Sequence, residues 1–130
     1  MQANEKKLRW VLKGNGAFSL LSGTGLIIAH QALADLMGVG NARVLLFIGI
    51  GLMLFSATVI QAGFRKSISP KQVQSIIIQD WAWVLGSGVI IGVEAWGLSA
   101  LAYWIITGVA LLVGDFAFFQ MRYLRRLERT

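Results

Sequence analysis

The sequence predicts an all-α, polytopic membrane protein: an antiparallel four-helix transmembrane bundle made of two tandem helical hairpins. Of its 130 residues, 56% are hydrophobic and only 14% are charged, which lies outside the usual range of soluble domains. Four mostly apolar segments each reach the roughly 20 residues that a helix needs to cross a bilayer. The basic residues gather in three stretches that share one side of the membrane if the chain crosses it four times.

The four predicted spans are 15–36, 43–64, 76–96 and 98–123. Gly38, Gly40 and Asn41 are typical of a turn between the first two spans. Ser69 before Pro70 is typical of a helix N-cap and predicts that the third helix begins there. Aromatic residues that predict interfacial belts are Trp10, Trp81, Trp83 and Tyr123 on the inner side, with Trp96, Tyr103 and Trp104 on the outer side.

The basic residues set the expected orientation. By the positive-inside rule, both termini are cytoplasmic, and the expected location is the bacterial inner (plasma) membrane. The net charge of +6 is explained by topology and by attraction to anionic lipid headgroups, so we expect membrane lipids and no nucleic acid as partners. Eleven of the twelve basic residues are Lys6, Lys7, Arg9 and Lys13 before the first span, Arg65, Lys66 and Lys71 between the second and third, and Arg122, Arg125, Arg126 and Arg129 at the end.

The first span allows a second interpretation. Its apolar run ends in Ala32-Leu33-Ala34 before Asp35, a pattern that resembles a secretory signal with its cleavage site. Cleavage there would leave three spans. We favour a retained first span because it matches a later segment of the chain.

That match suggests an internal repeat within a single transmembrane domain, 1–130. Residues 18–29 superpose on 81–92 with a shift of 63, which pairs Gly23 with Gly86. The second and fourth spans match at a shift of 59, which pairs Gly49 with Gly108. The repeat predicts two hairpins, 14–66 and 70–126, related by an axis along the membrane normal. The alternative is a chance alignment of glycine-rich apolar stretches.

Several kinds of chemistry find no support in the sequence. The chain has no cysteine and one histidine, so we expect no metal site and no cofactor. Two membrane aspartates, Asp80 and Asp115, invite comparison with intramembrane aspartyl proteases, but the Tyr-Asp and Gly-x-Gly-Asp motifs of those enzymes are absent. We therefore expect a protein that is not an enzyme.

Polar residues at helical spacing give each span one polar stripe. One interpretation is that the stripes line a hydrated pocket open to the cytoplasm, with Asp115 and Asp80 as its charged floor and Gln61 and Asn15 orienting the bound group. The other is that they are interhelical contacts, with the aspartates paired to Arg65, Arg122 or Lys66. The stripes are Asn15, Ser19 and Ser22 in the first span, Thr58, Gln61 and Arg65 in the second, Asp80, Ser87 and Glu94 in the third, and Gly108, Asp115 and Arg122 in the fourth.

Three runs of residues are similar to those of a family of small, uncharacterised four-helix bacterial inner-membrane proteins. They are Phe-Ser-x-x-Ser-Gly at 18–23, Asp-x-x-Trp-Val-Leu-Gly-Ser at 80–87 and Gln-x-x-x-Leu-Arg-Arg at 120–126. The resemblance implies the four-helix fold and carries no activity with it.

Two functions remain as expectations. The first is a non-enzymatic membrane protein that binds a lipid, a small amphiphile or a partner protein within the bilayer. The second is a small proton- or cation-coupled transporter or channel subunit that uses Asp115 and Asp80, which requires homo-oligomerisation if four helices enclose too little volume.

Overall fold

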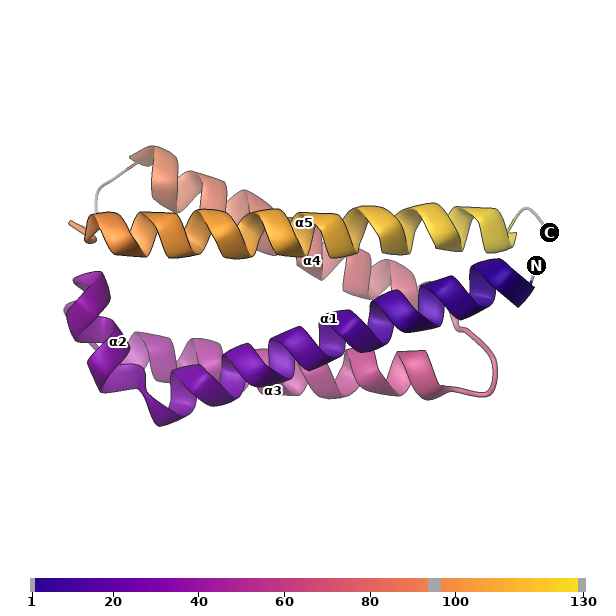
Figure 1. Cartoon of the computed structure of the whole chain (residues 1–130), viewed down its shortest axis with the longest axis horizontal. Helices are drawn as coiled ribbons and strands as arrows, with labels where there is room; N and C mark the ends of the chain where they lie inside the picture. Colours follow the sequence, from indigo (N-terminus) through magenta and orange to yellow (C-terminus); the bar gives the residue numbers. More distant parts are fainter. Residues whose placement is uncertain (1, 94–96, 129–130) are drawn as a thin grey trace.

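The computed structural model describes residues 2–93 and 97–128 and is helical almost throughout (Figure 1). Four of its helices are long and apolar enough to cross a membrane. The prediction of an all-helical chain with four helices able to cross a membrane is therefore confirmed. Within the described residues the helices are α1 (Gln2–Ile28), α2 (His30–Met37), α3 (Arg43–Phe64), α4 (Pro70–Val93) and α5 (Ala100–Glu128).

The predicted first span is wrong in its bounds. Helix α1 already begins at Gln2, so the basic N-terminal segment is helical. The helix breaks at Ala29, whose φ of −112° and ψ of 24° separate α1 from the short α2. Helix α2 ends at Gly38, which takes a left-handed conformation with φ 74°, as glycine readily does. The break lets α2 bury Ala34 and Met37 instead of continuing in line with α1.

Helices α1 and α3 pack together more closely than any other pair. A Cβ on Gly16 would lie 2.4 Å from the side chain of Ile60, and one on Gly23 would lie 2.8 Å from the carbonyl oxygen of Gly49. Residues later in α1 thus contact residues earlier in α3. Glycine permits this approach because it has no side chain to hold the backbones apart.

The end of α3 is held by a side chain from α1. The guanidinium of Arg9 donates hydrogen bonds to the carbonyl oxygens of Gly63 (3.0 Å), Lys66 (3.1 Å) and Arg65. It also forms an ion pair with Glu5 at 2.9 Å. The last carbonyls of a helix have no partner within the helix, so Arg9 satisfies groups that lipid cannot.

The second pair of long helices begins with two serine caps. The backbone N–H of Gln72 donates to Ser69 Oγ at 3.4 Å, which confirms the N-cap predicted before Pro70. Ser99 Oγ accepts from the N–H of Ala102 at 3.2 Å and donates to the carbonyl of Leu36 at 2.9 Å. Ser99 therefore ties α2 to the start of α5. The predicted belt residue Trp96 and stripe residue Glu94 lie outside the described residues.

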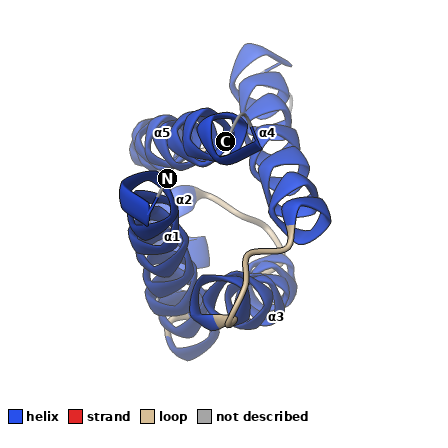
Figure 2. Cartoon of the chain, turned by 90° about the vertical axis from the view of Figure 1, so that its right-hand side faces the viewer, coloured by secondary structure: helices blue, strands red, loops and turns tan. Residues whose placement is uncertain are grey.

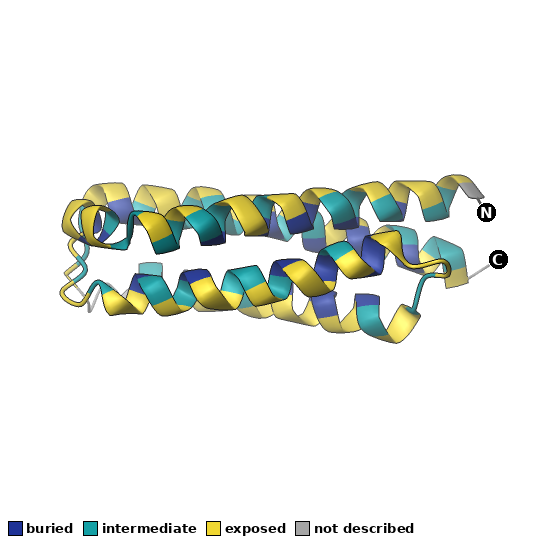
Figure 3. Ribbon diagram, turned by 90° about the horizontal axis from the view of Figure 1, so that it is seen from below, coloured by how far each residue is buried: buried dark blue, intermediate teal, exposed yellow. Residues whose placement is uncertain are grey.

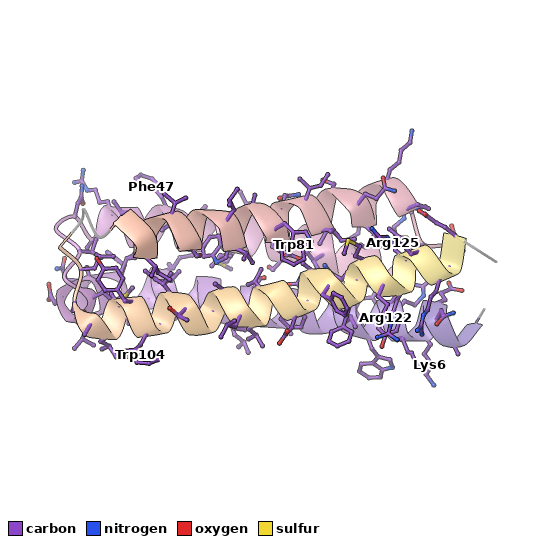
Figure 4. The ribbon with its side chains drawn as sticks, turned by 90° about the horizontal axis from the view of Figure 1, so that it is seen from above. Lys6, Phe47, Trp81, Trp104, Arg122 and Arg125 are labelled. Carbon is purple, nitrogen blue, oxygen red and sulfur yellow. The ribbon has the colours of Figure 1, made fainter. Side chains whose placement is uncertain are left out.

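The two ends of the bundle differ. At one end, here called the basic end, α1 and α4 begin and α3 and α5 finish (Figure 1); Lys6, Arg122 and Arg125 lie there, whereas Phe47 and Trp104 lie toward the other end, here called the α2 end (Figure 4). The larger apolar core lies in the basic half, and buried residues are frequent there (Figure 3). That core consists of Leu8, Leu12, Val59, Ala62, Val73, Ile76, Ile77 and Leu124.

A smaller apolar cluster closes the α2 end. It contains Ala34 and Met37 of α2, Leu45 of α3 and Ala102 of α5. Viewed along the bundle, the four long helices form a ring in which α1 lies beside α3 and α5, and α4 completes the ring (Figure 2). The two clusters leave the part of the bundle between them without a packed core.

Candidate functional site: a cavity between the two helix pairs

A cavity of about 1100 Å³ occupies the part of the bundle between the two clusters. It extends from Asp80 and Phe55, near the core of the basic half, to Met37 at the α2 end. Residues from all five described helices line it. Its volume reaches the upper end of the range of small-molecule and cofactor sites, which is about 300–1,000 Å³.

Glycines keep the cavity open. Gly25 of α1, Gly51 of α3 and Gly86 of α4 line it, and a Cβ added to any of them would meet nothing within 4 Å. The contrast with Gly23 and Gly49, which touch across α1 and α3, is direct. Neighbouring glycines of one helix thus serve close packing on one face and open space on the other.

Most of the cavity wall is aliphatic or aromatic. Leu26, Leu52, Ile90 and Ile106 line it from four different helices. A dry, apolar wall of this kind does not hold water well, because a bound water needs two to four polar partners. The cavity therefore suits an apolar chain better than a column of water.

The wall is weakest between α3 and α4. Both helices line the cavity along much of their length, yet they make few contacts with each other. Those contacts include the hydrogen bond of 2.8 Å from Gln72 Nε2 to Gln61 Oε1 at the basic end. Of the neighbouring long helices in the ring, α3 and α4 share the fewest contacts, so this side of the cavity is the least closely packed.

A buried polar triad forms the floor of the cavity. Asn15 Nδ2 donates to Asp80 Oδ2 at 2.9 Å and to Gln120 Oε1 at 2.9 Å. Gln120 Nε2 donates to the same Asp80 Oδ2 at 2.8 Å. The three side chains come from α1, α4 and α5 and are 1%, 3% and 0% exposed for Asn15, Asp80 and Gln120. The triad therefore links the two helix pairs where the packed core ends.

The triad leaves some polar atoms unused. Asn15 Oδ1 and Trp83 Nε1 are buried and have no hydrogen-bond partner among residues 2–93 and 97–128. Both amide donors reach Asp80 Oδ2, and within the described residues no hydrogen bond reaches Asp80 Oδ1. Asp80 and Trp83 lie one helical turn apart on α4, and both line the cavity. An unpaired carboxylate oxygen and an unpaired indole N–H therefore occur together at its floor.

No basic side chain neutralises Asp80. Across residues 2–93 and 97–128, the ion pair between Arg9 and Glu5 is the one that the structure contains. The expected pairing of the aspartates with Arg65, Arg122 or Lys66 is therefore wrong. Arg65 instead donates to Gln72 Oε1 at 3.2 Å.

The structure brings together the predicted residues of α1 and α4. Asn15, Ser19, Asp80 and Ser87 are buried, and Ser22 is half-buried. All of these except Asn15 line the cavity, and Asn15 holds its floor through Asp80. Two of the four predicted stripes thus face the interior.

The predicted stripes of α3 and α5 face outward. Thr58 and Gln61 are exposed on α3, Arg65 is exposed just beyond its end, and Asp115 and Arg122 are exposed on α5. Asp115 lies two residues from both Val113 and Ala117, which are buried. Two residues turn a helix by about 200°, so Asp115 points away from the interior. The prediction that Asp115 forms the cavity floor is wrong.

The cavity also lies in the other half of the bundle from the predicted pocket. The sequence predicts a pocket in the basic half, but Leu8, Leu12, Val59 and other apolar side chains fill that half. The buried polar side chains next to that core include the triad and Ser56, whose hydroxyl donates to the carbonyl oxygen of Met53 at 2.7 Å. The cavity begins beyond the triad and extends toward α2.

Gln120 is the site residue that the predicted polar stripes do not include. Its signal was its spacing: Val113, Ala117, Gln120 and Leu124 follow one another at intervals of three or four residues and are all buried. An amide on an otherwise apolar helical face is expected to find a buried partner. Asp80 and Gln120 also begin two of the three runs described above, so the fold brings those runs together.

The aromatic and metal predictions can be compared with the site. Trp83, predicted as an interfacial residue, instead lines the cavity with its indole nitrogen buried. Trp104 is 76% exposed, as a lipid-facing residue would be. Within the part of the chain that the structure describes, no group of three or more His, Asp or Glu side chains is placed to hold a metal ion.

Comparisons with known proteins identify no relative. No family model, curated protein or solved structure matches the chain.

Proposed function

We propose that the protein binds a lipid or another small amphiphile within the bilayer, in the cavity between the two helix pairs, and that it is not an enzyme. The observation that carries the proposal is the cavity itself, about 1100 Å³ of largely apolar space between four helices that are long enough to cross a membrane. A void of this size costs stability when empty, because its lining loses packing contacts. An apolar chain would restore those contacts.

The gap between α3 and α4 supplies a route for such a ligand. Lipid tails surround a membrane protein on all sides, so a lateral opening gives them access without passage through water. The polar triad at the floor would stop the chain from going deeper, and the apolar core of the basic half lies beyond it. A partner helix is a poorer fit, because the α2 cluster already closes one end of the cavity.

The proposal includes an orientation. The bundle is an antiparallel pair of hairpins in a bacterial inner membrane, with the basic end and both termini in the cytoplasm. The clustered Lys and Arg residues at that end support this orientation. The α2 end then lies at the outer surface, and the cavity occupies the outer part of the membrane.

Photo-crosslinking tests the proposal. Proteoliposomes would contain a phospholipid with a diazirine on its acyl chain, and crosslinked peptides would be mapped by mass spectrometry. We expect crosslinks at cavity residues such as Leu52 and Ile106 in addition to the exposed residues that face bulk lipid. Crosslinks confined to exposed residues would contradict the proposal.

Two glycine variants provide a matched pair for that experiment. Gly86→Leu fills the cavity, whereas Gly88→Leu changes the same helix at a glycine outside the cavity lining; a Cβ meets nothing within 4 Å at either position. We expect Gly86→Leu to abolish the crosslinks at Leu52 and Ile106 and Gly88→Leu to preserve them. Equal loss in both variants would mean that the cavity is not the binding site.

The second candidate is a proton- or cation-coupled transporter or channel subunit. Asp80 favours it, since a carboxylate in a membrane span commonly marks an ion pathway. The exposed position of Asp115 gives it no support as a second site in the same cavity. Flux of protons or monovalent cations across proteoliposomes, lost in Asp80→Asn, would favour this candidate over simple binding.

A further inference from the structure

We infer that the ligand of the cavity is a cationic amphiphile, with an ammonium-type head at Asp80 and an apolar tail that extends toward α2. This inference rests on the proposed function and adds the chemical class of the ligand. It starts from the juxtaposition of a buried carboxylate at the cavity floor with a cavity wall that is largely apolar.

The negative charge of Asp80 at the cavity floor has no positive partner in the described chain. Asp80 is 3% exposed, and no basic residue of the described chain pairs with it. The neighbours that do contact it are two neutral amides, from Asn15 and Gln120. Amide donors stabilise a carboxylate, but they do not cancel its charge. The chain itself therefore leaves a place for a positive group.

The second carboxylate oxygen of Asp80, Oδ1, is free to accept a hydrogen bond from a ligand. Both amides occupy Asp80 Oδ2, and Asp80 lines the cavity. Oδ1 receives no hydrogen bond from residues 2–93 or 97–128, so it is the oxygen available to a ligand. An ammonium group has three donors and no acceptor, which matches a lone carboxylate oxygen.

Aromatic side chains surround the position that a ligand head would take beside Asp80. Phe18 of α1, Phe55 of α3 and Trp83 of α4 line the cavity near its floor. Aromatic faces attract ammonium groups through cation–π interactions, and such cages are a common means of recognising organic cations. An anionic head would be repelled by the carboxylate, and a neutral head could donate a hydrogen bond but would leave the charge of Asp80 unbalanced.

A bare inorganic ion fits the cavity less well than an amphiphile does. An inorganic ion that loses its hydration shell needs several oxygen ligands, whereas the cavity beyond Asp80 is lined largely by glycines and by Leu, Ile and Val side chains. An amphiphile satisfies both parts, with its head at Asp80 and its chain along Leu52, Ile90 and Ile106. The unpaired Trp83 Nε1 would accommodate a hydroxyl or carbonyl oxygen next to the head.

A set of three probes with the same chain tests this inference. The full-length protein in lipid nanodiscs would be titrated with decylammonium, decyltrimethylammonium and decanol, and binding would be followed by tryptophan fluorescence. We expect decylammonium to bind about 30-fold or more tightly than decanol, as expected when a buried charge finds its partner. Decyltrimethylammonium separates the contribution of charge from that of N–H donation.

Two variants complete the experiment. Asp80→Asn keeps an acceptor for Asn15 and Gln120 but removes the charge, so it should lose the preference for decylammonium over decanol. Asp115→Asn removes an acid outside the cavity and should retain the preference. If Asp80→Asn does not fold, the ratio of the probes in the unaltered protein still decides the inference.

The outcomes separate the two proposals. Equal affinity for ammonium and alcohol in the unaltered protein would overturn the cationic head and leave amphiphile binding in place. No binding of any probe, together with an absence of cavity crosslinks, would overturn both. Binding of sodium or potassium ions in place of the probes would overturn the inference in favour of an inorganic cation.

Discussion

At the scale of single residues, the triad of Asn15, Asp80 and Gln120 is the feature on which the site depends. Three polar side chains on three helices are each 3% exposed or less, and their hydrogen bonds of 2.8–2.9 Å join the two helix pairs. A buried polar network stabilises a fold only when its members remain satisfied. The removal of one member should therefore be felt by the other two.

Gln120→Leu should lower the free energy of unfolding by about 1–3 kcal/mol, because Asp80 Oδ2 loses a donor and Asn15 Nδ2 loses an acceptor. Thermal or denaturant unfolding in mild detergent would measure the change. Asp115→Leu is the contrasting variant, since Asp115 is exposed and a charged residue at the centre of a lipid-facing span costs about 2.5–3.5 kcal/mol. We expect it to leave stability unchanged or raise it. A larger loss in Asp115→Leu than in Gln120→Leu would contradict the assignment of interior and exterior faces.

Arg9→Ala should destabilise the bundle by about 1–3 kcal/mol, because the carbonyls of Gly63, Arg65 and Lys66 at the end of α3 lose a charged donor. Hydrogen exchange of amides in the last turn of α3 would show the loss locally. Arg9→Lys keeps the charge but has fewer donors in a fixed arrangement, so it should recover only part of the stability. Full recovery by lysine would mean that charge alone holds the end of α3.

Five of the ten site residues predicted from the sequence lie at or beside the cavity, and the other five are exposed for a physical reason. Asn15, Ser19, Ser22, Asp80 and Ser87 were predicted as site residues and lie at or beside the cavity. Asp115 was grouped with them because it recurs at a spacing of seven with Gly108 and Arg122. In a soluble protein the apolar face of a helix shows which side is buried. A membrane helix is apolar on the side that faces lipid as well as on the side that faces the interior, so the sequence does not show which way a polar stripe points.

At the scale of helices, glycines decide where the bundle is tight and where it is open. Gly23 and Gly49 touch across α1 and α3, whereas Gly86 and Gly108, their counterparts in the proposed repeat, have open space around the position of a Cβ. The two hairpins thus share a pattern of small residues but use it differently. Helices α1 and α3 touch at these glycines, whereas the equivalent positions of α4 and α5 have no close neighbour.

Gly23→Ala and Gly86→Ala form a matched pair from equivalent positions. A Cβ at Gly23 would lie 2.8 Å from the carbonyl oxygen of Gly49, so we expect a loss of about 1–3 kcal/mol from overpacking. At Gly86 nothing lies within 4 Å, so alanine should have no effect or add up to about 1 kcal/mol through its higher helix propensity. Comparable losses from both substitutions, measured by unfolding in detergent, would show that α4 is as closely packed as α1.

The helices themselves were largely predictable, since length and hydropathy determine the spans. The predicted 43–64 coincides with α3, and the cap at Ser69 was predicted from the serine–proline pair. The break at Ala29 was not predictable, because Ala29 interrupts an apolar run and carries no glycine or proline signal. Burial of Ala34 and Met37 by α3 and α5 accounts for the direction of α2, and such tertiary contacts are not visible in a local pattern.

At the scale of the whole molecule, the protein is packed at its basic end and hollow beyond it. The core of the basic half holds the four long helices together, and α2 with the start of α5 closes the opposite end. This asymmetry follows the sequence: larger apolar residues such as Leu8, Leu12 and Ile76 fill the basic half, whereas Gly25, Gly51 and Gly86 lie along the cavity. A two-ended bundle of this kind has a fixed floor and an adaptable space above it.

The proposed orientation can be tested by chemical labelling, since the chain contains no cysteine. Single cysteines at Lys6, Arg125 and Gly40, which are exposed positions, would be treated in inner-membrane vesicles of known sidedness with a membrane-impermeant maleimide. We expect Lys6→Cys and Arg125→Cys to react from the cytoplasmic side and Gly40→Cys from the other. Reaction of Lys6→Cys and Arg125→Cys from opposite sides would contradict four crossings.

We propose that the cavity between the two helix pairs is a binding site and not a packing defect. A structure of the protein determined in a lipidic phase would test this most directly. We expect elongated density that extends from Asp80 along Gly51 and Gly86 toward α2. Direct contact between Gly51 and Gly86, with α3 and α4 packed together and the cavity closed, would contradict it.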